Sequence, residues 1–233
     1  MTKWRALATD FDGTIAREGV VSPSTHEALV NLKESGMLLL LVTGRELRDF
    51  AGLEVDLTLF DLIVAENGAI LYDPKTDHQQ VLAPPPSDAL VAELQKRDVS
   101  PLSVGQTIIA TTEPNEIHVL ESIKDLGLEL TITFNKGWVM ILPASVNKAS
   151  GLAAALERLQ LPAAEVVGVG DAENDHAFLS HCGFAVAVAN ALPSLKEKAH
   201  LVMDLPAGDG VKQLCEKLIA GAIEAVTLPP PKV

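Results

Sequence analysis

Two carboxylates follow a mostly apolar run near the N-terminus, in the stretch ATDFDGTIA. Asp10 and Asp12 are two residues apart, so on an extended chain both side chains point the same way. Burying two adjacent carboxylates is costly unless a hard cation binds their oxygens or one of them keeps its proton. A solvated turn is the alternative, because Asp-Gly pairs are common in loops. The pair is therefore a candidate for metal binding or acid–base chemistry.

Two further positions could hold an anion. Thr43 and Gly44 follow the apolar run LLLLV, and a hydroxyl with free N–H groups where a strand meets a helix suits an anion. A plain helix cap by Thr43 is the alternative. Lys148 is predicted near the start of a helix, where a cation opposes the helix dipole. A phosphate or an aspartate beside it would explain this position, and a solvated surface lysine is the alternative.

A fourth candidate lies in EVVGVGDAENDHAF, where a predicted apolar strand runs into Gly170 and Asp171. Asp171 and Asp175 could both face the strand ends, where open α/β sheets place ligands, and complete an oxygen cage for Mg²⁺. The alternative is that Asp171 caps the next helix. Because both acids follow a predicted buried strand, the metal site is the favoured interpretation.

The composition narrows the class of protein. The formal net charge of −13 over 233 residues argues against nucleic acid as the main partner, although a bound cation can still attract a small anionic substrate. Cys182 and Cys215 lack metal-ligand spacing, which favours reduced thiols in the cytoplasm. The N-terminus lacks the apolar region of a signal peptide, and the run MLLLLV is too short to span a bilayer. We therefore expect no membrane partner, and nothing in the sequence selects an oligomeric state.

Short apolar runs alternate with helical patterns in the first and last thirds of the chain, which predicts a parallel sheet with helices on both faces. Predicted strands cover 4–9, 37–42, part of 59–69, 165–170, 184–188 and 200–203, and predicted helices cover 22–36, 147–160, 173–181 and 210–225.

The middle of the chain breaks this rhythm. It contains two helical stretches, the run TIIATT, and two strands joined by Asn135-Lys136-Gly137, a spacing typical of an antiparallel hairpin. The sequence predicts a discontinuous core at 1–75 and 146–228, a smaller α+β insert at 76–145, and a flexible tail at 229–233.

Taken together, these motifs resemble those of the haloacid dehalogenase (HAD) superfamily. DFDGT is similar to its first motif, VTGR to its second, the Lys148 stretch to its third and GDAEND to its fourth. ENGA at 66–69, the stretch AVAVANALPSLKEKAHLVM and the DGV downstream resemble the Cof-type (IIB) subgroup. The resemblance implies an α/β fold with a Rossmann-like core and an inserted α+β cap of the C2B type, where the insert is predicted. Ala172 departs from the glycine that is frequent in the fourth motif.

The resemblance also implies roles for the acidic residues. Asp10 would attack phosphorus and become an aspartyl phosphate, and Asp12 would protonate the leaving alcohol and then activate water. A side-chain oxygen of Asp10, the backbone carbonyl of Asp12 and Asp171 would hold Mg²⁺. Asp175 would be a ligand directly or through water.

The remaining implied roles concern the substrate. Thr43 and the N–H of Gly44 would hold phosphoryl oxygens, Lys148 would neutralise the phosphoryl charge and orient Asp10, and Asn190 would reach the substrate. The predicted activity is Mg²⁺-dependent hydrolysis of a small phosphorylated metabolite, either a phosphorylated sugar or a small phospho-acid.

Other functions stay open at this level. A sugar phosphomutase resembles the same core and cap. A receiver domain also uses an acidic pocket, a Thr and a Lys, but its accepting Asp lies on a later strand and it has no insert. A non-catalytic phosphate-binding protein is a third possibility. Arg45 and His176 could contact substrate or lie on helix surfaces. The polar side chains of the insert that could choose the substrate are Ser103, Gln106, Thr107, Thr111, Thr112, Asn115, Glu116, His118 and Lys136.

Overall fold

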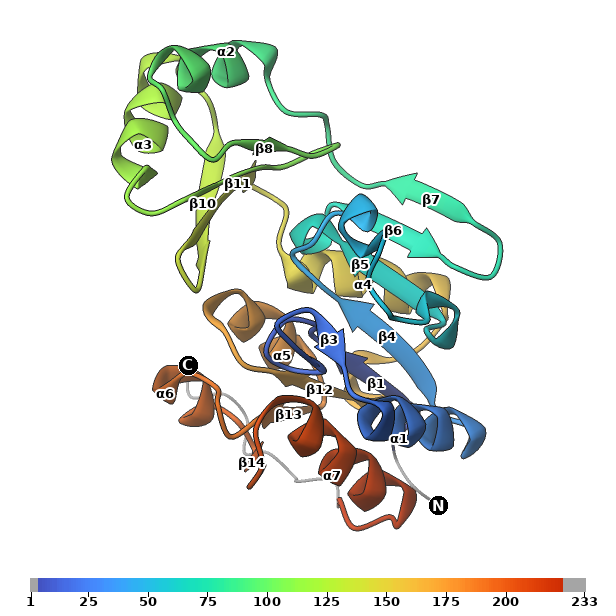
Figure 1. Ribbon diagram of the computed structural model, residues 1–233. Helices are drawn as coiled ribbons and strands as arrows, with labels where there is room; N and C mark the ends of the chain where they lie inside the picture. The colour runs from blue at the N-terminus through green and yellow to red at the C-terminus, as the bar shows by residue number, and fades with distance from the viewer. Residues whose placement is uncertain (1–3, 224–233) are drawn as a thin grey trace, which may run out of the picture.

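A computed structural model describes residues 4–223 of the chain (Figure 1). Its main sheet has eight strands in the order β14-β13-β12-β1-β4-β5-β6-β7, and neighbouring strands are parallel except in the β5–β6 and β6–β7 pairs at one edge. In chain order these strands are β1 (Ala6–Thr9), β4 (Leu38–Val42), β5 (Leu62–Ala65), β6 (Ile70–Asp73), β7 (His78–Val81), β12 (Val166–Gly170), β13 (Phe184–Ala187) and β14 (Leu201–Val202). The predicted parallel sheet is confirmed.

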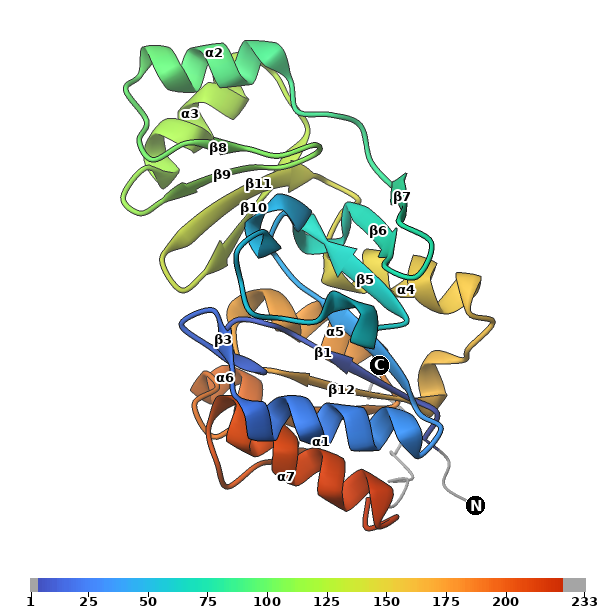
Figure 2. The same cartoon turned by 45° about the vertical axis from the view of Figure 1, so that its right-hand side comes forward.

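Helices cover both faces of this sheet, as the alternation predicts (Figure 2). Helix α1 (Pro23–Glu34) packs beside α7 (Ala207–Ile219), and α4 (Lys148–Arg158) packs beside α5 (His176–His181) on the opposite side. Helix α1 starts where its sequence indicates, because the Ser22 hydroxyl accepts a hydrogen bond from the Thr25 N–H and proline occupies the first turn. The short helix α6 (Pro193–Lys196) and the small hairpin of β2 (Ala16–Arg17) and β3 (Val20–Val21) complete this part.

A second, antiparallel sheet lies to one side of the first, in the order β10-β11-β9-β8 (Figure 1). Its strands are β8 (Ser103–Val104), β9 (Ile109–Thr112), β10 (Leu130–Asn135) and β11 (Trp138–Pro143), and its helices are α2 (Asp88–Lys96) and α3 (Glu116–Asp125). The predicted hairpin joins β10 to β11, with positive φ angles at Lys136 and Gly137 in the turn. One face of this sheet packs against α2 and α3, and the other faces the core.

Two predicted boundaries differ from the structure by more than three residues. Strand β7 pairs with β6 through a hairpin, so the chain stays in the core sheet until Val81 rather than leaving it at 76. The polar run HQQV carries no alternation that would have assigned it to either part. Helix α7 runs over Ala207–Ile219 rather than 210–225. The predicted tail at 229–233 and the core residues 224–228 lie outside the described residues.

Short 3₁₀ helices connect several of these elements: η1 (Leu47–Phe50), η2 (Leu57–Leu59), η3 (Glu66–Gly68), η4 (Ala163–Glu165) and η5 (Glu173–Asp175). Within residues 4–223 no helix is both long and apolar enough to cross a membrane.

The order of the central strands brings distant segments together. Strand β1 lies between β12 and β4, and Thr9 is in register with Val169 on one side and with Leu41 on the other. Because parallel strands end at the same edge, the loops after β1, β4 and β12 meet there. This edge therefore collects the first, second and fourth motifs, and the second sheet lies over it (Figure 1).

Candidate active site

Three buried carboxylates and one buried lysine meet at this edge. One carboxylate oxygen from each of Asp10, Asp171 and Asp175 lies within 4.8 Å of the others. The Nζ of Lys148 donates to Asp10 Oδ1 at 2.5 Å and to Asp175 Oδ1 at 2.7 Å. Lys148 is only 1 % exposed, so it is not a solvated surface lysine. An aspartate pair is therefore the anionic partner for a lysine at the start of a helix.

The titration of these groups follows from their burial. Burial raises the pKa of Asp10 to about 7, the negative charge of Asp175 adds to the rise, and the Lys148 ammonium opposes it. Burial also raises the pKa of Asp171 above its usual range. Burial alone would lower the pKa of Lys148, but Asp10 and Asp175 outweigh it and raise that pKa. The lysine is therefore charged, and ionising all three carboxylates of the cluster together is unfavourable.

Asp175 also shapes the loop that follows β12. Its Oδ2 accepts the backbone N–H of Asp171 at 2.7 Å and that of Ala172 at 3.0 Å, which closes the turn. A Cβ at Gly170 would lie 2.6 Å from the same oxygen, so glycine is required there. Asp175, rather than Asp171, therefore makes the local backbone bonds, and the carboxylate of Asp171 points into the site.

Asp171 accepts hydrogen bonds from three separate parts of the chain. The Thr14 hydroxyl donates to its Oδ1 at 3.3 Å, and Asn190 Nδ2 donates to its Oδ2 at 3.1 Å. The third donor is the ammonium of Lys136. Asn190 also donates to the Gly13 carbonyl at 2.8 Å, so the structure brings Asn190 to the edge of the cluster.

Asp12 lies apart from the carboxylate cluster. The guanidinium of Arg45 binds both of its oxygens, each at 2.7 Å, in a bidentate ion pair. The guanidinium also lies 5.2 Å from the centre of the Phe11 ring. Arg45 therefore contacts the second acid of the first motif, at the mouth of the site.

Thr43 and Gly44 lie under the second sheet. Thr43 is fully buried, and its hydroxyl accepts the Arg45 N–H at 3.1 Å. A Cβ at Gly44 would lie 3.0 Å from Met140 Cε and 3.3 Å from Asn67 Oδ1, so the glycine permits close packing there. Asn67 itself donates to the sulfur of Met140 and accepts from Asn174 Nδ2 at 2.9 Å. Asn67 belongs to the ENGA motif at 66–69, but the sequence predicted no site role for it or for Met140.

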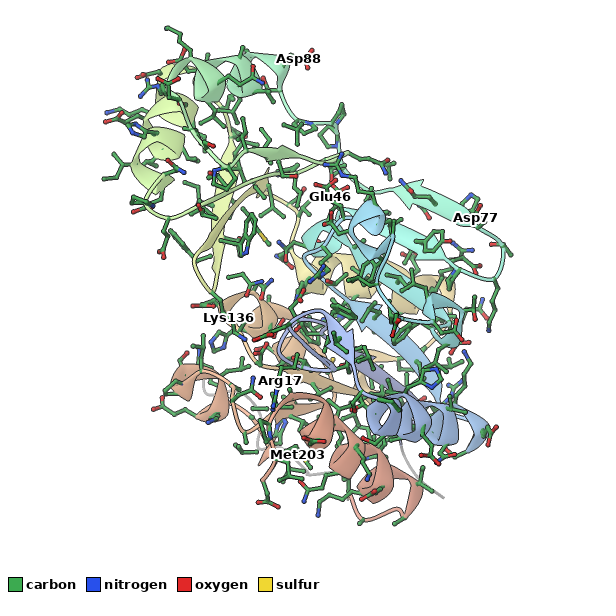
Figure 3. All side chains as sticks on the ribbon, viewed as in Figure 1. Arg17, Glu46, Asp77, Asp88, Lys136 and Met203 are labelled. Carbon is green, nitrogen blue, oxygen red and sulfur yellow. The ribbon has the colours of Figure 1, made fainter. Side chains whose placement is uncertain are left out.

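Lys136 contacts the carboxylate cluster directly. From the sequence it was one of several polar candidates in the insert, with nothing to distinguish it from the others. It lies in the turn between β10 and β11, between the second sheet and the core (Figure 3). Its ammonium pairs with Asp171, and a Cβ at Gly13 would come within 2.5 Å of Nζ. The Asn-Lys-Gly turn was visible in the sequence, but the hairpin's direction was not.

Two buried glutamates, for which the sequence predicted no role, join the two sheets. Glu66 accepts the N–H of Gln106 at 3.1 Å, and the N–H of Thr107 and its hydroxyl at 2.9 and 3.0 Å. Glu46, which Figure 3 places between the two sheets, accepts the Ser103 hydroxyl at 2.9 Å. Three of the predicted substrate-selecting side chains, those of Ser103, Gln106 and Thr107, therefore lie where the two sheets join.

Two other predicted substrate-selecting residues, Thr111 and Asn115, form hydrogen bonds within the second sheet and its connecting segments. The Thr111 hydroxyl donates to the Pro101 carbonyl at 2.6 Å, and Asn115 Nδ2 donates to the Ser100 carbonyl at 3.1 Å. Both lie on the helix side of the sheet, away from the carboxylate cluster.

The cluster fits a divalent cation. Its three carboxylates are buried and their oxygens converge. Among residues 4–223, Lys148 is the one buried lysine or arginine, while the half-exposed Lys136 reaches Asp171 from the second sheet. Burial raises the pKa values of Asp10 and Asp171, and the negative charge of Asp175 adds to both rises, so a cation bound here would favour the ionised carboxylates. Carboxylate oxygens are the donors that hard cations prefer. Asp10, Asp171 and Asp175 are the residues that could hold such an ion.

Comparison with known proteins agrees with this arrangement. The sequence pattern of the haloacid dehalogenase-like hydrolases matches residues 7–118 and 93–214. The chain belongs to this family, and within it the chain is a Cof-type phosphoric monoester hydrolase.

Relatives are found both in sequence and in structure. A phosphoglycolate phosphatase of Methanothermobacter thermautotrophicus is 32 % identical over 228 residues, which is 92 % of this chain and 99 % of that protein. A haloacid dehalogenase-like hydrolase from Bacteroides thetaiotaomicron has the same fold, with a TM-score of 0.78 at 18 % identity over 92 % of this chain and 99 % of that one. A subclass IIB sugar phosphatase has a TM-score of 0.75 at 20 % identity, covering 91 % and 98 %.

Proposed function

We propose that this enzyme hydrolyses a small phosphate monoester, a phosphorylated sugar or a small phospho-acid, with Mg²⁺ and through an aspartyl phosphate on Asp10. The observation that supports this most directly is the buried Lys148 between Asp10 and Asp175. The ammonium fixes one oxygen of Asp10, so the carboxylate is oriented before a substrate arrives. The similarity to a phosphoglycolate phosphatase supports a small phosphorylated metabolite as substrate.

The reaction divides into two displacements. In the first, a carboxylate oxygen of Asp10 forms a bond to phosphorus, the ester P–O bond breaks, and Asp12 gives a proton to the leaving alcohol. In the second, Asp12 takes a proton from water, the water oxygen attacks phosphorus, and Asp10 leaves as a carboxylate. Arg45 holds Asp12 at the mouth of the site, and we assign it the role of positioning this acid.

Other groups of the chain stabilise the transferred phosphoryl group. Lys148 begins α4, whereas Thr43 and Gly44 lie in the loop after β4; we assign Lys148, Thr43 and the N–H of Gly44 to the phosphoryl oxygens. Asn190, beside Gly13 and Asp171, is assigned to the substrate. A Mg²⁺ ion held by Asp10, the Asp12 carbonyl, Asp171 and Asp175 would neutralise charge on the phosphoryl group.

We also propose a division of labour between the two sheets. The eight-stranded sheet and its helices form the catalytic core, and the chain from α2 through β11 forms the cap, which chooses the leaving group. Cys182 and Cys215 are both buried and free, which supports a cytoplasmic location.

The test is phosphate release from a panel of small phosphate esters, with Mg²⁺ and with a chelator, comparing the unmodified enzyme with Asp10→Asn. We expect metal-dependent release that the substitution abolishes. No release from any ester by folded, Mg²⁺-loaded protein would contradict the phosphatase. An isomeric sugar phosphate as the product, in place of free phosphate, would indicate a mutase.

A further inference from the structure

The cap hairpin places an exposed tryptophan above the site. Trp138 begins β11, two residues after Lys136 and two before Met140. Lys136 contacts Asp171 of the fourth motif, and Met140 contacts Asn67 beside Gly44 of the second motif. Because Trp138 lies between these two contacts along the strand, it lies over the space between the two motifs.

The pleat of the strand decides the direction of the indole. Side chains two apart on a strand point to the same face, so Trp138 shares the face of Met140 and Leu142, which packs toward the core. Val139 and Ile141 point to the opposite face, and Ile141 packs with the helices α2 and α3. The indole is therefore on the side of the cap sheet that covers the catalytic groups.

The side chain of Trp138 is not buried in the hydrophobic core of the cap. It retains 44 % of its surface exposed, while the next four residues of β11 are 7 % exposed or less. Its cross-strand neighbours are the polar residues Asn135 and Thr112. A large apolar surface left open beside polar neighbours and above a catalytic cluster is a typical lining of a small-molecule site.

We propose that Trp138 is a specificity-determining residue, against which the carbon skeleton of the ester's leaving group packs while the phosphoryl group lies at Asp10. This assignment rests on the proposed phosphatase function and extends it to the recognition of the alcohol. An indole face binds the C–H surface of a small alcohol without a directional bond, so its effect is on binding of the leaving group rather than on the phosphoryl transfer.

The hairpin offers a matched control. Phe134 on β10 is also a large exposed aromatic residue, 39 % exposed, and it is in register with Val139. It therefore lies on the helix side of the sheet, away from the site. Phe134→Ala removes an aromatic ring from the same hairpin without touching the site.

The kinetic experiment separates the leaving group from the phosphoryl group. The KM for phosphoglycolate and for glucose 6-phosphate, whichever is hydrolysed, is compared with the inhibition constant of inorganic phosphate, which has no leaving group. For Trp138→Ala we expect KM to rise about tenfold, because the leaving group loses one apolar surface against which it packs. The phosphate inhibition constant should stay unchanged. Trp138→Phe should restore most of the affinity, and Phe134→Ala should leave both constants unchanged.

Quenching of tryptophan fluorescence tests the same role of Trp138 by binding alone, without turnover. The chain has two tryptophans, and Trp4 is 4 % exposed with its indole N–H bonded to the Ile223 carbonyl. Acrylamide quenching of the fluorescence therefore reports mainly on Trp138. In full-length Asp10→Asn with Mg²⁺, the bound ester should shield Trp138 from acrylamide, and inorganic phosphate should not.

The outcomes are distinguishable. Equal changes in KM and in the phosphate constant, equal effects of Trp138→Ala and Phe134→Ala, or equal shielding by ester and phosphate would each overturn the assignment while leaving the phosphatase standing. Absence of hydrolysis of every ester by the unmodified enzyme would remove the proposed function and this assignment with it.

Discussion

The core and the cap hold their site residues in opposite ways. On the core, the side chains of Asp10, Lys148, Asp171 and Asp175 are at most 7 % exposed. Lys148 binds Asp10 and Asp175, and Asp171 accepts hydrogen bonds from Thr14 and Asn190 of the core as well as from Lys136 of the cap. On the cap, the side chain of Lys136 is 43 % exposed and Trp138 is 44 % exposed.

The difference in exposure follows from the separate functions of the core and the cap. Phosphoryl transfer is the same for every ester, and its groups work best when their geometry is fixed before binding. The leaving alcohol differs from ester to ester, and exposed side chains on a hairpin can change without disturbing a buried network. Substitutions on the core should therefore act on all esters alike, and those on the cap should act selectively.

The largest effect is expected for Lys148→Met. It removes the buried cation that orients Asp10, so kcat should fall about 10²- to 10³-fold on every ester. Steady-state kinetics on two esters checks this, with circular dichroism to establish folding. Lys124→Met, an exposed lysine in the last turn of α3, is the control. A loss of kcat confined to one ester would contradict the expectation that substitutions on the core act on all esters alike.

A smaller loss is expected where the two parts join. Glu66→Ala leaves the buried N–H groups of Thr107 and Ile108 without their acceptor, which should cost about 2–4 kcal/mol of unfolding free energy. Denaturant unfolding measures the loss, and hydrogen exchange should rise in residues 103–110. Glu66→Gln keeps an acceptor oxygen and should cost less. Unchanged exchange in that segment would show that Glu66 does not hold the cap.

The stabilising effect of metal should depend on pH. With a pKa of about 7, Asp10 keeps a proton in the folded protein that the unfolded chain loses near pH 4. Stability contributed by this proton is complete below about pH 4 and is lost as the pH rises to about 7. A divalent cation favours the ionised carboxylate, so it should raise the melting temperature more at pH 8 than at pH 5.

Thermal melts with and without MgCl₂ from pH 5 to pH 8 test this dependence. In Asp10→Asn the titrating group is absent, so the pH dependence of the metal effect should be weaker. The same gain in melting temperature at pH 5 and pH 8 in the unmodified enzyme would contradict it.

The smallest effect concerns the cap lysine. Lys136 pairs its ammonium with Asp171, one of the proposed metal ligands, so the tethered cation should compete with a bound ion. Lys136→Met should tighten Mg²⁺ binding about two- to fivefold, a small change because half-exposed ion pairs are weak. Isothermal titration calorimetry measures it, with Lys124→Met as the control. Weaker binding in Lys136→Met would mean that the lysine assists the metal site.

Several features were predictable because they are local. The alternation of apolar strands and helices predicted the parallel sheet, and the Asn-Lys-Gly turn predicted the β10–β11 hairpin. Asp10, Thr43 and Asp171 could be predicted as site residues because each follows an apolar strand, and parallel strands end at one edge. The assignment of β7 failed because its residues are polar and its partner is chosen by a hairpin turn rather than by an apolar pattern.

The sequence by itself determined which chemical groups are present and that the strand ends would bring them together. Only the tertiary structure decided which of them are neighbours. The burial of Lys148 between two aspartates, the pairing of Asp12 with Arg45, and the direction of Lys136 and Trp138 depend on contacts between segments far apart in the chain. No local propensity encodes such contacts, because they arise when the faces of separate elements pack together.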